Sequence, residues 1–345
     1  MKILYVENMI LGHHVPYVQA LAGYKGHESV IVTPQKIPAV PQKQFVFPKM
    51  NFDSKKISDY CECLRYIDKV AGEESVDIIH FLDGDKIMRY FGMGMGRLSR
   101  KRPVVITYHH LFEGTVRRIS YVMMCRHRAA VVHTAQIQNR LKRYGIRSVT
   151  HIEYPGFLAA PPDERSKKES VPVIGMFGGT RYEKGLDILI KALENVHRPY
   201  RLLIAGREDD YTRGDVEKMC AKIRANVTLD MRFLPETELA RYWNETDLVV
   251  LPYRRVFDGA SGQLTEGVRR GLPIIGSEHG SLGSIIRENH LGMTFRTEDS
   301  EDLALKIEAV LKDGFVYDSV AKDYQEAMSP ERFCRDYQRL YASLV

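Results

Sequence analysis

The chain has 345 residues, of which 44% are hydrophobic and 27% are charged. This composition is typical of globular proteins and excludes disordered, collagen-like and coiled-coil chains, and the length corresponds to about two domains. No apolar run approaches the roughly 18–20 residues that a membrane-spanning helix requires. The first residues, MKILYVENM, lack the small-residue cleavage site of a signal peptide, so none is expected here.

The net charge of +6 is unevenly distributed along the chain. Residues 1–165 carry a net charge of +9 and residues 166–345 carry −3. Within the first half, residues 86–147 hold 14 basic residues against the single acid Glu113. A basic block interleaved with apolar residues suggests an anionic membrane surface or an acidic acceptor. An ordinary solvated face is the second interpretation, and nucleic acid is a distant third because no nucleic-acid motif is present.

The cysteines argue against extracellular cross-linking. There are five of them, an odd number, and none forms a CxxC pair. A disulfide framework or a zinc ribbon is therefore not expected, and a reducing compartment fits best. We expect a cytoplasmic protein, with peripheral contact to the inner face of the membrane if the basic block binds lipid.

The first half of the chain alternates short apolar runs with segments that can be helical. An apolar run at 2–6 leads through a glycine-containing loop into an amphipathic pattern, which is the strand–loop–helix start of an open sheet. Further β-branched runs follow at 29–33, 76–81, 103–108 and 129–134. This alternation predicts a parallel sheet with right-handed crossovers.

A proline-rich, charged segment at 159–170 is the best candidate for a linker. After it the alternation restarts, with apolar runs at 171–177, 201–206, 227–234, 247–253 and 272–277. The chain ends in a predicted helix with Ser329 as N-cap and Pro330 in the first turn. The sequence therefore predicts an α/β protein made of two doubly wound domains of similar size.

One segment, 174–193, combines features of an anion-binding turn. An apolar strand runs into Gly178 and Gly179, followed by Arg181, Lys184 and an amphipathic helix. Glycines allow close backbone approach, the helix N-terminus offers free N–H groups, and the two cations suit a diphosphate. The alternative is a strand–helix turn with two solvated cations, which the motif alone favours less than phosphate binding.

A second segment, 257–277, carries two acids around a loop. Asp258 and Glu266 are eight residues apart, with the sequence SGQL (261–264) between them at a predicted helix N-terminus. The loop amides can bind an anion or a sugar, and the carboxylates can accept hydrogen bonds from hydroxyls. Taken alone, this segment is better explained by a turn cap at Asp258 and an ordinary surface acid at Glu266.

Together the two segments resemble retaining nucleotide-sugar glycosyltransferases of glycosyltransferase family 4, which have the GT-B fold. The resemblance covers most of 172–290, including FGGTRYEKGLDILIKAL and SGQLTEGVRRGLPIIGSEHGSLGSII. It implies that Arg181 and Lys184 hold the donor diphosphate and that Glu266 contacts the ribose. Asp258 stands where the first acid of the family, usually a glutamate, is expected. The typical PFG after that acid is replaced by a loop containing Ser261 and Gly262.

The resemblance also implies contacts in both halves of the chain. Donor-binding positions are expected at Gly12, Gly179, Arg181, Lys184, Ser261, Gly262, Gln263, Leu264 and Glu266. His109, in ITYHHLF, matches a histidine that contacts the donor sugar near the reacting carbon, and we expect it to act there with Asp258 and Glu266. Asp83 and Asp85 look like a metal-binding D-x-D, but a loop or acceptor role is favoured because this fold does not generally need metal. No metal or cofactor is expected.

The resemblance implies transfer of a sugar from a nucleoside diphosphate to an acceptor hydroxyl with retained anomeric configuration, in cell-surface glycan or glycolipid synthesis. It divides the chain into an acceptor domain (1–165), a donor domain (166–325) and a C-terminal helix (326–345) that packs back on the first domain. An epimerase or phosphorylase of the same fold is one rival. A non-catalytic GT-B-like protein that binds nucleotide sugar or supports a partner transferase is the other.

Overall fold

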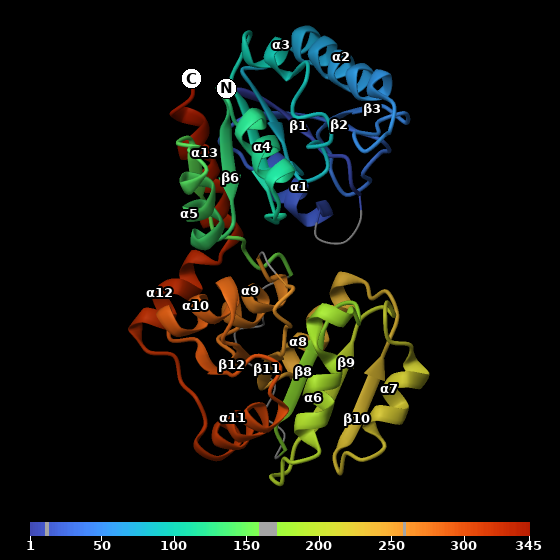
Figure 1. Ribbon diagram of the computed structural model, residues 1–345, viewed down its shortest axis with the longest axis vertical. Helices are drawn as coiled ribbons and strands as arrows, with labels where there is room; N and C mark the ends of the chain where they lie inside the picture. Colours follow the sequence, from blue (N-terminus) through green and yellow to red (C-terminus); the bar gives the residue numbers. More distant parts are fainter. Residues whose placement is uncertain (11–13, 159–170, 258–259) are drawn as a thin grey trace. The chain divides into compact units, whose positions relative to one another are not determined.

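The computed structural model describes residues 1–10, 14–158, 171–257 and 260–345. The chain forms two compact units. Unit 1 comprises residues 1–154 together with 330–345, and unit 2 comprises residues 155–329. Each unit contains one parallel β-sheet with helices on both faces, so the α/β architecture predicted from the alternating apolar runs is confirmed (Figure 1).

The sheet of unit 1 has seven strands in the order β3-β2-β1-β4-β5-β6-β7. Every pairing in it is parallel. The strands are β1 (Lys2–Val6), β2 (Glu28–Thr33), β3 (Lys43–Val46), β4 (Ile78–Phe81), β5 (Val104–Tyr108), β6 (Ala129–Val132) and β7 (Val149–His151). The strand order reverses between β1 and β4, which makes this pair the topological switch point of the unit.

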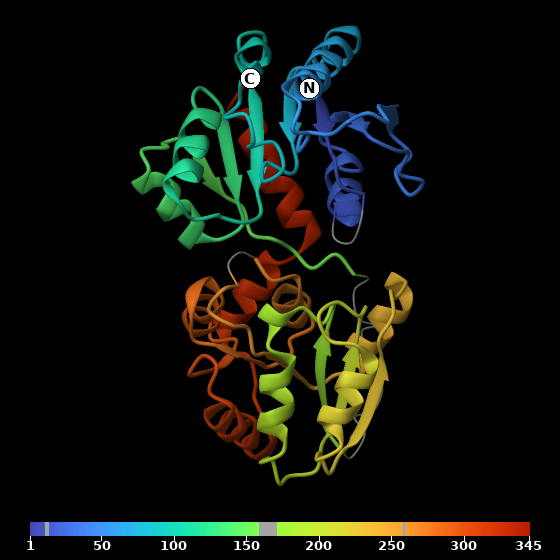
Figure 2. The ribbon, with the colours of Figure 1, turned by 45° about the vertical axis from the view of Figure 1, so that its right-hand side comes forward.

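Two sets of helices cover this sheet. The helices are α1 (His14–Ala22), α2 (Ile57–Glu73), α3 (Met95–Ser99), α4 (Thr115–Met124), α5 (Ala135–Arg143) and α13 (Pro330–Ala342). Helices α2 to α5 share one apolar core with alternate residues of the strands, such as Leu4, Val6, Ile79 and Ile106. Helices α1 and α13 lie side by side on the other face, α13 in red beside the dark-blue α1 (Figure 2).

A buried polar network fastens α13 to this second face. Tyr337 bonds through its hydroxyl to Tyr17 (2.5 Å) and to Thr107 (2.9 Å), while the Tyr341 hydroxyl meets His80 Nδ1 at 2.6 Å. Burial lowers the pKa of His80 well below its ordinary value, so this ring is neutral. The C-terminal helix is thus an integral part of unit 1, held by satisfied polar groups as well as by apolar packing.

The sheet of unit 2 has six strands in the order β10-β9-β8-β11-β12-β13. They are β8 (Val173–Phe177), β9 (Arg201–Ala205), β10 (Asn226–Asp230), β11 (Leu248–Leu251), β12 (Ile274–Ser277) and β13 (Gly292–Phe295), all paired in parallel. The order reverses between β8 and β11. This unit therefore has its own switch point, equivalent to the one in unit 1.

Helices again cover both faces of the second sheet. They are the short 3-10 helix η1 (Tyr182–Lys184), α6 (Leu186–Leu193), α7 (Arg213–Cys220), α8 (Glu236–Glu245), α9 (Gly262–Arg269), α10 (Gly280–Glu288), α11 (Ser300–Asp313) and α12 (Ser319–Ala327). Helices α6, α7 and α11 enclose one apolar core, and α8, α9, α10 and α12 enclose the other. Trp243 fills the second core, stacked on Phe177 at 4.1 Å between ring centroids.

The unit boundaries differ from those predicted at 165/166 and 325/326. Residues 155–158 already belong to unit 2 because α9 binds their backbone: the Leu158 N–H donates to Glu266 Oε1 at 2.8 Å, and Arg269 donates to the Gly156 carbonyl at 3.1 Å. At the other end, α12 packs against α9, so unit 2 extends to Ser329. The sequence shows composition changes, whereas these boundaries depend on tertiary hydrogen bonds.

Within the parts of the chain that the structure describes, no helix has the length and apolar character needed to cross a bilayer. All five cysteines are free thiols. Burial raises the pKa of Cys125 and Cys334 to about 12, so these thiols remain protonated and act as small apolar residues.

Candidate functional site

The predicted phosphate-binding turn lies at the switch point of unit 2. Strand β8 ends at Phe177 and leads through Gly178 into η1 and α6, while the neighbouring strand β11 leads to the N-terminus of α9. Gly178 has φ +83°, and a Cβ at this position would lie 2.7 Å from Lys184 Nζ and 2.9 Å from Gln263 Nε2. The left-handed backbone favours glycine here, and a side chain would enter the space beside these two polar groups.

Lys184 is a buried cation beside this turn. The residue is 9% exposed, and the structure gives its ammonium no hydrogen bond or ion pair with a described residue. Burial, with a smaller contribution from the charge of Arg181, lowers its pKa to about 8. A buried charge without a hydrogen-bonding partner destabilises a fold, so this lysine is a candidate for binding an anion.

Arg181, the other predicted cation, lies at the surface beside this lysine. Its side chain is 47% exposed and forms an ion pair with Glu183 at 3.0 Å, a contact of the kind that an incoming anion can replace. The adjacent Gly179 faces Asp209, whose Oδ2 would lie 1.9 Å from a Cβ on the glycine. Gly179 therefore allows β8 and the loop after β9 to approach closely, whereas Gly178 is the member of the glycine pair that adjoins the lysine ammonium.

The SGQL sequence forms the start of α9, as predicted. Ser261 is the N-cap, and its hydroxyl accepts a hydrogen bond from the Leu264 N–H at 3.2 Å, while Gly262 is the first helical residue. Gln263 donates to the carbonyl of Phe177, which ties α9 to the end of β8, and its Oε1 is buried without a partner. Leu264 is different, because its side chain lies in the apolar core and only its backbone can face a ligand.

Glu266 is buried and already bonded through both oxygens. Its Oε1 accepts from the Leu158 N–H, and its Oε2 pairs with Arg270 Nη1 at 2.5 Å. The guanidinium of Arg270 in turn lies over the ring of Trp243. Glu266 thus holds the backbone at Leu158, near the start of unit 2. The sequence predicted a contact of Glu266 with ribose but not this structural role.

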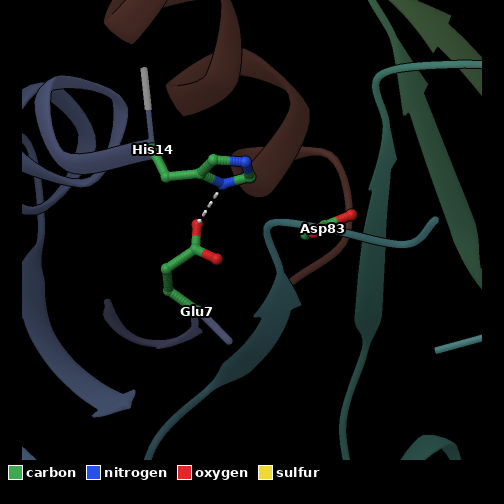
Figure 3. A group of neighbouring side chains, drawn as sticks. All are labelled: Glu7, His14 and Asp83. Carbon is green, nitrogen blue, oxygen red and sulfur yellow. Dashed lines mark hydrogen bonds and ion pairs between the residues drawn. The ribbon is translucent and has the colours of Figure 1, made fainter. Parts of the chain in front are cut away.

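The switch point of unit 1 has the opposite chemistry. Glu7 follows β1, Asp83 follows β4, and His14 opens α1; ligand atoms of the three side chains lie within 4.8 Å of one another, and all three residues are buried (Figure 3). His14 Nδ1 lies 3.1 Å from Glu7 Oε2. Such a set can hold a cation or accept hydrogen bonds from sugar hydroxyls. The sequence analysis considered Asp83 as part of a D-x-D pair but did not single out Glu7, although the position of Glu7 directly after a buried strand was an available signal.

The carboxylates of this cluster are held in a poorly solvated site. Burial, reinforced by the charge of Glu7, raises the pKa of Asp83 to about 6. Burial alone would lower the pKa of His14, but its hydrogen bond and charge interaction with Glu7 raise it above the ordinary value.

His109 belongs to the same edge of unit 1. It follows β5, and its ring lies 5.7 Å from that of His14 and 5.4 Å from that of Tyr17 (centroid distances). Its Nε2–H donates to the Leu82 carbonyl at 2.9 Å. Asp85 accepts a hydrogen bond from the backbone N–H of His109 at 3.1 Å. Of the D-x-D pair, Asp83 therefore belongs to the cluster, whereas Asp85 holds the backbone at His109. The predicted contact of His109 with the donor stays a prediction.

Two predicted residues, Gly12 and Asp258, lie outside the residues that the structure describes. Of the other predicted donor contacts, Gly179, Arg181, Lys184, Ser261, Gly262, Gln263 and Glu266 gather around the ends of β8 and β11 in unit 2. Their binding roles stay predictions.

Known protein families match both halves of the chain. The family model described as Glycosyl transferases group 1 matches residues 171–313, and the one described as Glycosyltransferase Family 4 matches residues 17–157. The two matches together cover well over half of the chain. The protein therefore belongs to the family 4 type of GT-B glycosyltransferases, as the resemblance implied.

Individual relatives agree with this classification. An uncharacterised glycosyltransferase of Methanocaldococcus jannaschii is 26% identical over 172 residues; the match spans 48% of this chain and 43% of the relative, less than half of either. Among solved structures, a glycosyltransferase of Rickettsia africae has a TM-score of 0.77 at 17% identity, covering 99% of this chain and 98% of its own. Anabaena HepE in complex with UDP has a TM-score of 0.76 at 15% identity over the full length of both chains. These likenesses show the GT-B fold.

Proposed function

We propose that this glycosyltransferase transfers a sugar from a nucleoside-diphosphate sugar to an acceptor hydroxyl with retention of anomeric configuration, in the synthesis of cell-surface glycans or glycolipids. The observation that carries the proposal is Lys184, a buried ammonium without a partner among the described residues, next to Gly178 at the switch point of unit 2. A diphosphate supplies the missing negative charge. HepE, a protein of the same fold, was crystallised with UDP and with UDP-glucose, which supports the donor class.

In this proposal, Lys184 and Arg181 act on the leaving group, the nucleoside diphosphate. The bond between the anomeric carbon and the diphosphate oxygen breaks with its electron pair on the diphosphate, while a bond forms to the acceptor oxygen. In a front-face reaction the acceptor proton passes to the departing diphosphate. Lys184, Arg181 and the first amides of α9 then stabilise the charge that develops, a preorganised contribution of roughly 3–4 kcal/mol for a key donor. No metal is assigned a part in this proposal.

The remaining residues have subsidiary roles. Gln263 and Ser261 hold the start of α9 against β8, and Glu266 binds the ribose hydroxyls from the next turn of the same helix. In unit 1, we assign the acceptor to the edge that carries Glu7, His14 and Asp83, whose oxygens and ring nitrogen suit hydroxyl groups. His109 and Asp258 are proposed to orient the transferred sugar. A lipid-linked acceptor on an anionic membrane surface, contacted through residues 86–147, completes the proposal.

The rival interpretation is a non-catalytic protein that binds nucleotide sugar. It shares the diphosphate site but predicts no turnover, so binding alone does not separate the two. The discriminating experiment follows release of nucleoside diphosphate from a panel of UDP-, GDP-, ADP- and TDP-sugars, with and without candidate acceptors.

Variants connect this turnover to the site. Lys184→Ala and Arg181→Ala should each lower turnover by a factor of about 100 or more, whereas Lys191→Ala, an exposed lysine of α6, should leave it unchanged. Turnover by the Lys184 variant at the normal rate would refute the assignment. Nucleotide binding without turnover of any donor would favour the non-catalytic rival.

A further inference from the structure

Helix α4 of unit 1 presents an apolar face to solvent. Val116, Ile119, Val122 and Met123 are between 41% and 65% exposed, and the spacing of these residues puts them on one side of the helix. The opposite side packs into the core through Tyr121 and Met124. A surface helix of a globular protein normally turns polar residues outward, so α4 has two apolar faces and only one of them is covered.

Cations border this exposed stripe. Arg117 and Arg118 are exposed in the first turns of α4, with the guanidinium of Arg117 over the exposed ring of Phe112 and that of Arg118 over Tyr144. Arg126 follows the C-terminus of the helix and is also exposed. Glu113, the single acid of residues 86–147, is paired with Arg140 at 2.9 Å. The surface is therefore apolar in the middle and positively charged at its border.

A hollow of about 580 Å³ continues the stripe at the C-terminal end of α4. Val122 and Met123 line it, together with the basic residues Arg126, Arg128 and Arg147. The described residues around it include no acid. Arg128 is 8% exposed, donates one Nη to the Met124 carbonyl and has a buried Nε without a partner. The exposed arginines Arg126 and Arg147 beside apolar walls match a phosphate headgroup attached to an acyl chain.

We propose that the outer face of α4, with this basic hollow, docks unit 1 on an anionic lipid bilayer. The four apolar side chains enter the boundary between headgroups and acyl chains, the arginines bind headgroup phosphates, and the hollow takes one of these phosphates. A second copy of the chain fits poorly, because a two-fold contact would place this basic face against itself. Charge complementarity therefore selects the anionic membrane.

The position of α4 gives the docking a use in the reaction. The helix begins shortly after the end of β5, where His109 lies, and runs back toward the start of β6. In a parallel sheet the strand ends lie at one edge, so the N-terminus of α4 lies at the same edge as the strand ends that precede Glu7 and Asp83. This inference deepens the proposed function by naming the surface on which the acceptor is met, and it rests on that function for its purpose, but vesicle binding is measured without donor or acceptor.

The test is co-sedimentation of the full chain with vesicles of phosphatidylcholine alone or with 30% phosphatidylglycerol (about a third anionic lipid). We expect binding to the anionic vesicles only, weakened by raising the salt concentration. Ile119→Glu with Met123→Glu should lower the partition coefficient at least tenfold. Arg126→Ala with Arg147→Ala should lower it about 25-fold, since each cation near the surface contributes about fivefold. Leu305→Glu, at an exposed leucine of α11 in unit 2, is the matched control and should bind normally.

Four results would overturn the proposal. If the α4 variant and the Arg126/Arg147 variant bind vesicles as well as the parent does, the membrane contact lies elsewhere. If the parent does not bind anionic vesicles, the chain has no such contact. A concentration-dependent dimer that Ile119→Glu dissociates would assign the stripe to a second copy. Inorganic phosphate at matched ionic strength should not displace the vesicles; full displacement would make the hollow a free-phosphate site. Donor turnover with a water-soluble acceptor, measured without vesicles, does not depend on the membrane contact and should be unchanged in these variants, so failure of docking and failure of the transfer reaction are distinguished.

Discussion

The two switch points of this molecule have the same topology and opposite charge. In unit 2, the ends of β8 and β11 surround the buried cation Lys184, whereas in unit 1 the ends of β1 and β4 carry the buried acids Glu7 and Asp83. One architecture thus carries two clusters of opposite charge, and the residues after the strands decide which charge each cluster presents. Burial lowers the pKa of Lys184 and raises the pKa of Asp83, so in both clusters the charged form of one group is disfavoured. Each of these charges therefore lowers the free energy of unfolding while no ligand is bound.

The largest expected effect is a loss of stability when Arg270, which supports Glu266, is replaced. Arg270→Met leaves Glu266 buried without its counterion, and loss of one partner of a buried pair costs about 3–5 kcal/mol. Urea denaturation measures this free energy. Arg241→Met removes an exposed pair with Glu245 and should cost less than about 0.5 kcal/mol. A loss below about 1 kcal/mol for Arg270→Met would show that Glu266 is free to serve the ligand alone.

The acidic switch point predicts a stabilising substitution. Because the pKa of Asp83 is raised to about 6, the folded state binds a proton more tightly than the unfolded chain, and stability falls as the pH rises from about 4 to 6. Asp83→Asn should remove that fall and stabilise unit 1 at pH 7 by about 1–3 kcal/mol. Thermal unfolding at pH 4.5 and 7 tests this. A variant less stable than the parent at pH 7 would contradict the view that this acid is kept for a ligand.

The buried lysine at the switch point of unit 2 predicts that donor binding weakens at high pH. With a pKa of about 8 in the free protein, Lys184 is charged below pH 8 and loses its proton above it, so affinity for a nucleoside diphosphate should be level from pH 7 to 8. Above pH 8 it should fall by up to tenfold per pH unit. Titration calorimetry from pH 7 to 9.5 measures it. This fall in affinity above pH 8 should be absent in Lys184→Met. An unchanged fall in that variant would assign the proton to another group.

The comparison also shows what sequence alone can predict. The cationic site lies largely within two contiguous segments, so Gly179, Arg181, Lys184 and the α9 cap at Ser261 could be singled out from their order and spacing. The acidic site is assembled from Glu7, His14 and Asp83, which three separate elements bring together. Its residues have no local motif, and only the strand order places Glu7 beside Asp83. The alternating runs were sufficient for the two sheets, but the unit boundary at Pro155 depends on bonds made by Glu266 and Arg269.

The central claim is the proposal that Lys184, which makes no ion pair with a described residue, is kept buried in order to hold the donor diphosphate. Thermal unfolding of the parent and of Lys184→Met, each with and without a panel of nucleoside diphosphates, tests it most directly. The account predicts that one nucleotide stabilises the parent, by about 2.7 kcal/mol at a hundredfold excess over its dissociation constant. It predicts that Lys184→Met is the more stable protein without ligand and that no nucleotide stabilises it. A variant that is less stable without ligand and still gains the full nucleotide shift would contradict the account.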